Sequence, residues 1–390
     1  MSFVGQAGTL FMLAPQGEEG VLYIGGNFTT VRGEDRNRVA AVSSSVEESD
    51  PSLLAWDPDC DERVLCMALH GTYMYLGGHF NKVGGEDRNA AAAVDASPNV
   101  SDPQVMCWNP DCKEAPPFEQ NAQVHCMILS GDAIYLGGRF VTVRGETRNR
   151  VAVVEREVDM TEPFLYDWNP NCDGTVECLL LHGDDMYVGG RFTSIRSTAR
   201  NRLATVDSNI NAANPSLRVW NPDCNNHVEC MVLNEDDLYI GGWFTTVRGV
   251  SRNRLAAIDS DVSQAAPAVR PWNPNSGGIV WTLLLASDVL YVGGQFTTIG
   301  GEYRHRIAAI DSDVNEETPE LKPWNLDYSI DVRHMILEGS TLYTGGSFTS
   351  IDSVTRNHAA AVSSDTSQAN PTLRPWNPNC NSTIRCMLLV

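Results

Sequence analysis

Short apolar runs alternate with turn-rich joints along the whole chain. In the stretch 168–220, apolar runs at 176–181, 186–188, 203–206 and 217–220 are separated by joints rich in Gly, Asp, Asn and Pro. Runs of this length, bounded by such joints, predict β-strands. No stretch has apolar residues spaced by about 3.6 positions over roughly ten residues, so we predict no helix of any length.

The same unit of four predicted strands returns at a fixed period. An apolar residue followed by Tyr-x-Gly-Gly-x-Phe occurs seven times, at steps of 52 or 60 residues. The first glycines of the pairs are Gly25, Gly77, Gly137, Gly189, Gly241, Gly293 and Gly345. A period of this size indicates a repeat architecture, and four short strands per unit are typical of a propeller blade. We predict one all-β domain, residues 1–390, folded as a seven-bladed β-propeller of four-stranded blades.

Residues that recur in every unit are interpreted as structural. The glycine pair permits close approach of another segment, and a recurring tryptophan can fill the space between blades. A recurring arginine is expected to stack on an aromatic ring or pair with a recurring Asp; a ring of ligand-binding arginines is the alternative. The tryptophans are Trp56, Trp108, Trp168, Trp220, Trp272, Trp324 and Trp376. The arginines are Arg36, Arg88, Arg148, Arg200, Arg252, Arg304 and Arg356.

These motifs carry a family resemblance. A di-glycine after an apolar strand, with a tryptophan later in a unit of about 50 residues, resembles kelch-type propellers. The fuller pattern Trp-Asn-Pro…Leu-Tyr-x-Gly-Gly-x-Phe-Thr…Arg-x-x-x-Ala is closer to the delta-60-repeat propellers, which occur in large bacterial, viral and surface proteins. The resemblance covers nearly the whole chain. It implies the propeller fold and, for function, a binding or scaffolding role.

The two ends of the chain leave the closure of the ring open. Residues 384–390 look like the first strand of an eighth unit, and we expect them to complete the first blade. A strand at residues 9–14 could complete it instead, or the chain could be part of a longer protein. The first residues lack the positive segment of a secretory signal, so we do not expect one there.

Charge narrows the classes of partner. The chain has 28 Lys and Arg against 49 Asp and Glu, a net charge of −21. This balance argues against binding to nucleic acid or to an anionic membrane, and no apolar run indicates membrane insertion. Acidic residues concentrate in the joints on one predicted face, and arginines in the joints on the other. Such a disc could stack on itself or dock other protein subunits, unless the arginines are paired internally.

Ten of the eleven cysteines follow the repeat. Five units carry a pair, and in the other two units both members are missing, which predicts disulfides. The predicted bridges are Cys60–Cys66, Cys112–Cys126, Cys172–Cys178, Cys224–Cys230 and Cys380–Cys386. Metal ligation and buried free thiols are the alternatives. Bridges would indicate an extracellular, cell-surface or virion location; free cysteines would favour the cytoplasm.

Candidate binding residues lie where the copies differ. The residue before the second cysteine varies around the expected central channel, as Leu65, His125, Glu177, Glu229, Trp281, Arg333 and Arg385. Trp243 and Trp281 are the two tryptophans outside the repeat position, and they could form a platform for a glycan or a partner. The insertion 113–122 adds Lys113, Pro117 and Phe118 as a candidate partner contact.

No catalytic motif, metal-ligand spacing or cofactor signature stands out in the sequence. We therefore predict a protein that is not an enzyme and that acts as a structural or protein-interaction scaffold, without cofactor or metal. A glycan-binding propeller is the first alternative, and it requires exposed tryptophans. An enzyme acting on polysaccharide is the second, with Glu177 and Glu229 as the carboxylates to examine.

Overall fold

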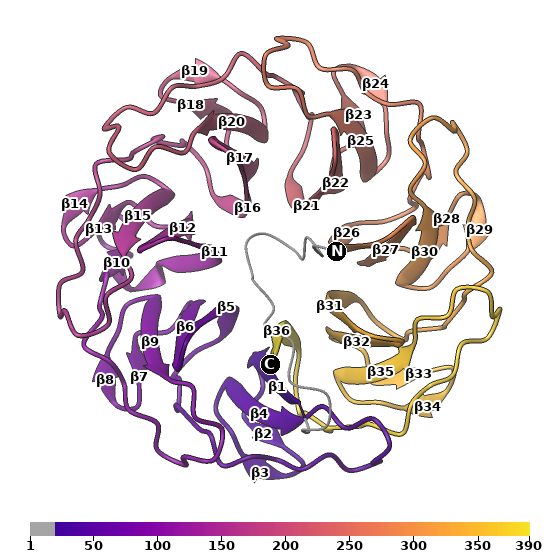
Figure 1. Cartoon of the computed structure of the whole chain (residues 1–390), viewed down its shortest axis with the longest axis horizontal. Coiled ribbons are helices and arrows are strands. Elements are labelled where there is room, and N and C mark those ends of the chain that lie inside the picture. Colours follow the sequence, from indigo (N-terminus) through magenta and orange to yellow (C-terminus); the bar gives the residue numbers. More distant parts are fainter. Residues whose placement is uncertain (1–19) are drawn as a thin grey trace.

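The computed structural model describes residues 20–390, and this part of the chain is built almost entirely from β-strands. Its only helix is the single 3-10 turn η2 (Glu119–Asn121). Seven three-stranded antiparallel sheets share one topology, with an inner, a middle and an outer strand. They stand around a common centre, and the innermost strand of each sheet faces that centre (Figure 1).

The inner strands are β36 (Ile384–Leu389), β5 (Val64–His70), β11 (Gln123–Ser130), β16 (Val176–His182), β21 (Val228–Asn234), β26 (Val280–Ala286) and β31 (Val332–Glu338). The middle strands are β1 (Val21–Gly26), β6 (Tyr73–Gly78), β12 (Ala133–Arg139), β17 (Asp185–Gly190), β22 (Asp237–Gly242), β27 (Val289–Gly294) and β32 (Thr341–Gly346). The outer strands are β4 (Val39–Ser43), β9 (Ala91–Asp95), β15 (Val151–Glu155), β20 (Leu203–Asp207), β25 (Leu255–Asp259), β30 (Ile307–Asp311) and β35 (Ala359–Ser363).

In each unit, a small hairpin of two strands, each two residues long, lies in the connection between the middle and the outer strand. The first strands of these hairpins are β2 (Thr30–Val31), β7 (Lys82–Val83), β13 (Thr142–Val143), β18 (Ser194–Ile195), β23 (Thr246–Val247), β28 (Thr298–Ile299) and β33 (Ser350–Ile351). Their partners are β3 (Glu34–Asp35), β8 (Glu86–Asp87), β14 (Glu146–Thr147), β19 (Thr198–Ala199), β24 (Val250–Ser251), β29 (Glu302–Tyr303) and β34 (Val354–Thr355). The extra strand β10 (Cys112–Lys113) pairs with β13.

The predicted fourth strand is reduced to one bridge per unit. In the unit of β16, β17 and β20, the expected strand at 217–220 contributes only the bridge between Leu217 and Val206. Trp220, three residues later, is fully buried and donates to the backbone of the next sheet, so the chain leaves the outer strand of its own sheet after this bridge.

The C-terminal strand completes the first sheet, as expected. β36 pairs antiparallel with β1, with Leu22 opposite Leu389 and Ile24 opposite Met387. The alternative partner at residues 9–14 lies outside the described residues. Residues near the two ends of the described chain therefore share one sheet.

An aromatic pair joins each unit to the next. The Tyr187 and Trp220 rings meet edge to face with centroids 5.5 Å apart. Trp220 Nε1 donates to the carbonyl oxygen of Asp259 at 2.9 Å, and the Tyr187 hydroxyl donates to the carbonyl oxygen of Ser260, also at 2.9 Å. All seven units repeat this arrangement. Each pair thus buries two rings and ties them to the backbone of the following sheet.

The recurring arginines bind backbone, and neither of the partners expected from the sequence is used. Arg200 donates to the carbonyl oxygens of Ala199 and Arg218, each at 2.9 Å. The equivalent arginine in every other unit donates to the carbonyl 18 residues further on. The guanidinium thereby fixes the joint between the outer strand and the following tryptophan.

The predicted disulfides are absent, since all eleven cysteines are free thiols. The two members of a pair lie in different layers of the core: Cys172 packs in the apolar cluster around Trp168, and Cys178 in the next cluster, around Trp220. The second thiol of each pair fills the space over a glycine of the middle strand. A Cβ at Gly189 would come within 2.6 Å of Cys178 Sγ. The cysteine pattern therefore reflects packing, and the argument for an oxidising location loses its basis.

This packing predicts a rescue experiment. Gly189→Ala should lower the free energy of unfolding by about 1–3 kcal/mol through overpacking against the Cys178 thiol. Adding Cys178→Ala should recover part of that loss, so the double variant should be more stable than the sum of the single effects predicts. Urea unfolding of the four proteins measures the coupling.

Gly183 provides the control for that cycle. It has a φ of +57°, and a Cβ there meets no atom within 4 Å. Gly183→Ala should cost about 1 kcal/mol through backbone strain, and Cys178→Ala should not reduce that cost. Equal coupling at both glycines would contradict the packing explanation.

Candidate functional site

Every inner strand carries a β-bulge at the same position. Val176 lies opposite Gly190 and Cys178 lies opposite Gly189, so Glu177 is an extra residue without a partner on β17. The same shift occurs in the other six sheets. The seven bulge residues are Leu65, His125, Glu177, Glu229, Trp281, Arg333 and Arg385. Because bulges re-aim a side chain and are common at active sites, the ring of variable residues predicted from the sequence has a structural basis.

Two buried carboxylates of adjacent units share one guanidinium. The side chains of Glu177 and Glu229 are only 8% and 7% exposed. Arg191 Nε lies 2.5 Å from Glu177 Oε1, and an Arg191 terminal nitrogen lies 3.8 Å from Glu229 Oε1. His125 Nδ1 makes a short contact with the other oxygen of Glu177, and its Nε2 lies 3.0 Å from Gln123 Oε1. Both oxygens of Glu177 therefore have a close partner, whereas the nearest cation of Glu229 is Arg191, at 3.8 Å.

The surroundings push the pKa values of the two carboxyl groups apart. Burial alone would raise the pKa of Glu177, but the electrostatic and hydrogen-bond contacts of His125 and Arg191 outweigh burial and hold that pKa well below its usual range. Burial and the nearby Glu177 carboxylate raise the pKa of Glu229 to about 7, although Arg191 partly opposes this. Such a divergence between neighbouring titratable groups is typical of acid–base catalysis.

Two tryptophans border Glu229. The Trp243 and Trp281 rings meet edge to face at 5.8 Å, with an angle of 81° between their planes. Both are half-buried, whereas the glycan-binding alternative requires exposed rings. Both indole N–H groups are buried; the Trp281 N–H has no hydrogen-bond partner within residues 20–390, and the Trp243 side chain lies beside the Glu229 carboxyl group and lowers its pKa. We call His125, Glu177, Arg191, Glu229, Trp243 and Trp281 the central cluster.

The central cluster is open to solvent on one side. The Arg191 side chain is 46% exposed although it contacts both buried carboxylates. Arg191 occupies the variable position of Gly-Gly-x-Phe, where sequence analysis singled out only Trp243. That variable position was the signal that could have identified Arg191, but its contact with two carboxylates depends on how adjacent sheets meet.

The insertion 113–122 is anchored at its base and exposed at its tip. Glu114, 7% exposed, accepts from Arg139 Nε at 3.1 Å and from an Arg150 terminal nitrogen at 2.7 Å. Lys113 Nζ pairs with Asp111 at 2.7 Å. Phe118 is 58% exposed, and Pro117 is also exposed. The structure thus does not bring Lys113, Pro117 and Phe118 into the central cluster.

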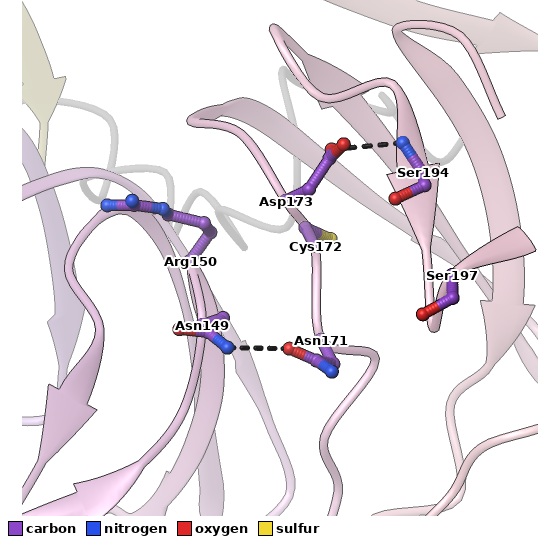
Figure 2. Close-up of a pocket in the computed structure, with 7 residues that line it drawn as sticks. All are labelled: Asn149, Arg150, Asn171, Cys172, Asp173, Ser194 and Ser197. Atoms are coloured by element: carbon purple, nitrogen blue, oxygen red, sulfur yellow. Dashed lines mark hydrogen bonds between the residues drawn. The ribbon is translucent and has the colours of Figure 1, made fainter. Parts of the chain in front are cut away.

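Surface pockets lie away from the cluster, at the joints between units. One of about 250 Å³ is lined by Asn149, Arg150, Asn171, Cys172, Asp173, Ser194 and Ser197 (Figure 2). Asn149 donates to Asn171 at 2.6 Å, and Asp173 accepts from the Ser194 amide at 2.9 Å. A second pocket, lined by Asn357 and Asn379 among others, contains the equivalent amide pair at 2.7 Å. The same polar groups hydrogen-bond to one another in several units. We therefore interpret these pockets as structural features of the repeat.

In residues 20–390, no helix is long and apolar enough to cross a membrane. In the same range, no three His, Cys, Asp or Glu side chains are grouped as they would be to hold a metal ion.

Comparisons with known proteins relate this chain to others through its fold. No family model matches the sequence, and no curated protein matches it. A putative 6-phosphogluconolactonase from Bacteroides fragilis matches with a TM-score of 0.61 and 10% identity over 97% of this chain and 100% of that one. A protein of the same description from Bacteroides uniformis has a TM-score of 0.55 and 10% identity, over 95% of this chain and 99% of that one.

A computationally designed protein also matches, with a TM-score of 0.50 and 9% identity, over 97% of this chain and 92% of that one. At such identities these similarities establish a propeller-like fold. The prediction of a non-enzymatic scaffold is nevertheless contradicted, because the two natural neighbours bear the name of an enzyme. The case for chemistry in this chain itself depends on its central cluster.

The opposite pKa shifts predict opposite effects on stability. The raised pKa of Glu229 means that its contribution to stability is present below pH 4.5 and is lost as the pH rises through about 7. Glu229→Gln, which stays neutral, should therefore be more stable than the parent at pH 8 by on the order of 1–3 kcal/mol. The two proteins should be nearly equal at pH 5. Thermal unfolding at both pH values measures the difference.

Glu177→Gln is the matched variant with the opposite sign. The pKa of Glu177 is depressed, so its contribution is present above pH 4.5 and is lost only in strong acid. Glu177→Gln should accordingly be less stable than the parent at both pH 5 and pH 8. Stabilisation by this variant at pH 8 would overturn the assignment of the two carboxyl groups.

Proposed function

We propose that the protein is a hydrolase whose active site is the central cluster, with Glu229 as the general base. The observation that carries the proposal is a pair of buried carboxylates, joined through Arg191, whose pKa values are displaced in opposite directions. A general base works best when its pKa is close to the working pH. Two proteins with a similar fold bear the name of an enzyme, which also favours a hydrolase.

The substrate class that fits best is a lactone or another ester of a sugar acid. The Glu229 carboxylate would take a proton from a water molecule, whose oxygen then forms a bond to the substrate carbonyl carbon. Collapse of the tetrahedral intermediate breaks the carbon–oxygen bond of the ester, and Glu229 returns the proton to the departing oxygen. The half-exposed Arg191 can balance the charge that develops on the carbonyl oxygen.

Glutamate pairs also serve in the hydrolysis of glycosides, which makes a polysaccharide-acting enzyme the second candidate. That reaction needs one protonated carboxyl group and one carboxylate that is free to act as nucleophile or base. The raised pKa of Glu229 suits the first role. Glu177, however, is held by His125 and Arg191 through both its oxygens, which favours ester hydrolysis with a single working carboxyl group.

We also infer that the seven sheets are the blades of one seven-bladed propeller, with the single-bridge segment as a residual fourth strand. Seven sheets of one topology and seven equivalent bridges support this inference. Membership of the delta-60-repeat group, which the sequence motifs suggest, stays a proposal alongside it.

The proposed role of Glu229 predicts a specific loss of activity. In a pH-stat assay against a panel of sugar lactones, including 6-phosphogluconolactone, Glu229→Gln should lower kcat/KM by about 100-fold or more. Glu114→Gln is the matched control, because Glu114 is an equally buried and arginine-paired glutamate outside the cluster. It should retain near-parental kcat/KM. No turnover of any lactone or glycoside by the parent would refute the proposal.

The neighbours of Glu229 should shift the pH profile in opposite directions. In the parent, kcat/KM should rise as Glu229 loses its proton near pH 7. Arg191→Met removes a cation that lowers this pKa, so the rise should move to higher pH. Glu177→Gln removes a carboxylate that raises it, so the rise should move to lower pH. Profiles that do not move in either variant would exclude Glu229 as the titrating base.

A further inference from the structure

A second group of charged side chains lies beside the central cluster and has no part in the proposed chemistry. Arg333 and Arg385 are the bulge residues of the inner strands β31 and β36. Arg63 directly precedes β5, the next inner strand around the ring. Contacts join β31 to β36 and β36 to β5, so the three arginines belong to consecutive units. We call Arg63, Arg333 and Arg385 the arginine triad.

The arginine triad carries more positive charge than its surroundings neutralise. A terminal nitrogen of Arg333 lies 2.5 Å from Asp331, whose side chain is 4% exposed. The guanidinium groups of Arg385 and Arg63 have no hydrogen bond or ion pair with any residue in the range 20–390, and Arg385 Nε and Arg333 Nε are buried without a partner. Three cations therefore have one ion-paired carboxylate, that of Asp331, and the Glu229 carboxyl group attracts Arg333 from the central cluster without an ion pair.

The positions of these groups are fixed by their neighbours. The Arg333 guanidinium carbon lies 4.6 Å from the centroid of the Trp281 ring, an arrangement in which ring and cation attract each other. The partnerless Trp281 N–H lies on that same ring. Burial, together with the nearby Arg333 and Arg63 cations, lowers the pKa of Arg385 to about 10, and Asp331 partly opposes this shift. Unfavourable charge held in place in this way is relieved by an anion.

We propose that the arginine triad is a binding site for a phosphate monoester group, presented by a small phosphorylated ligand. Guanidinium groups bind phosphate through paired N–H donors, and a dianion would offset the charges of Arg63 and Arg385, which have no ion pair. The adjacent Trp281 offers an apolar surface for the carbon skeleton of the same ligand. The site is defined without reference to catalysis; if the proposed hydrolase function holds, it places the charged end of the substrate beside Glu229.

Calorimetric titration with glucose 6-phosphate, inorganic phosphate and unphosphorylated glucose tests this proposal at constant ionic strength. The parent protein should bind glucose 6-phosphate and phosphate, and binding of glucose should be undetectable. Arg385→Met should weaken binding of both anions at least tenfold, whereas Arg385→Lys, which keeps the charge, should weaken it less. Arg144→Met is the matched control, because Arg144 is already paired with Glu162 and lies in the hairpin of another unit. It should bind like the parent.

A stability measurement guards against a trivial loss of binding. Because Arg385 is repelled by its neighbours, Arg385→Met should melt at the same temperature as the parent or higher in chloride. Phosphate should raise the melting temperature of the parent and of Arg144→Met, and leave that of Arg385→Met unchanged. Equal phosphate binding by Arg385→Met and Arg144→Met, or binding of glucose as tight as that of its phosphate, would overturn the site. Phosphate binding without turnover would instead overturn only the hydrolase proposal.

Discussion

The edge-to-face contact between a tyrosine of one unit and the tryptophan that follows it is the interaction on which the structure depends. Its two polar atoms donate to backbone carbonyl oxygens of the next sheet, so each ring is fixed in position as well as buried. A single unit has no partner for these groups, and only neighbouring units satisfy them. The relative placement of sheets, and hence of the inner strands, follows from seven copies of one contact.

That placement gives the central cluster its electrostatic character. Glu177 and Glu229 occupy equivalent positions in adjacent units, so the repeat itself brings two like charges together. One carboxylate is then stabilised by His125 and Arg191, and the other is buried beside Trp243 with Arg191 3.8 Å away. The repeat thus places two carboxyl groups close together, where their charges repel each other. Because the neighbouring side chains differ between the two units, only one of the two carboxyl groups is readily ionised.

Much of the fold could be predicted from the sequence because the repeat is read directly from glycine and tryptophan positions. The variable ring residues were likewise visible, because they change between copies while their neighbours recur. The cysteines were misinterpreted because sequence proximity does not reveal that Cys172 and Cys178 lie in different layers of the core. The role of Arg191 depends on contact across a sheet boundary, and the fourth strand is reduced to one bridge where Trp220 packs against the next sheet. Neither effect follows from a local pattern.

On each inner strand, the residues that flank the bulge maintain the packing of the sheets, whereas the bulge residue differs from unit to unit. Its flanking positions are occupied by a buried Val or Ile and, in most units, by Cys, which pack against the neighbouring sheet. The bulge residue itself lacks a ladder partner, and Leu, His, Glu, Trp and Arg all occur there within this one chain. In a propeller-like fold of this kind, the residue at each bulge can be substituted independently of the others. The strands that hold these residues keep the same pairing.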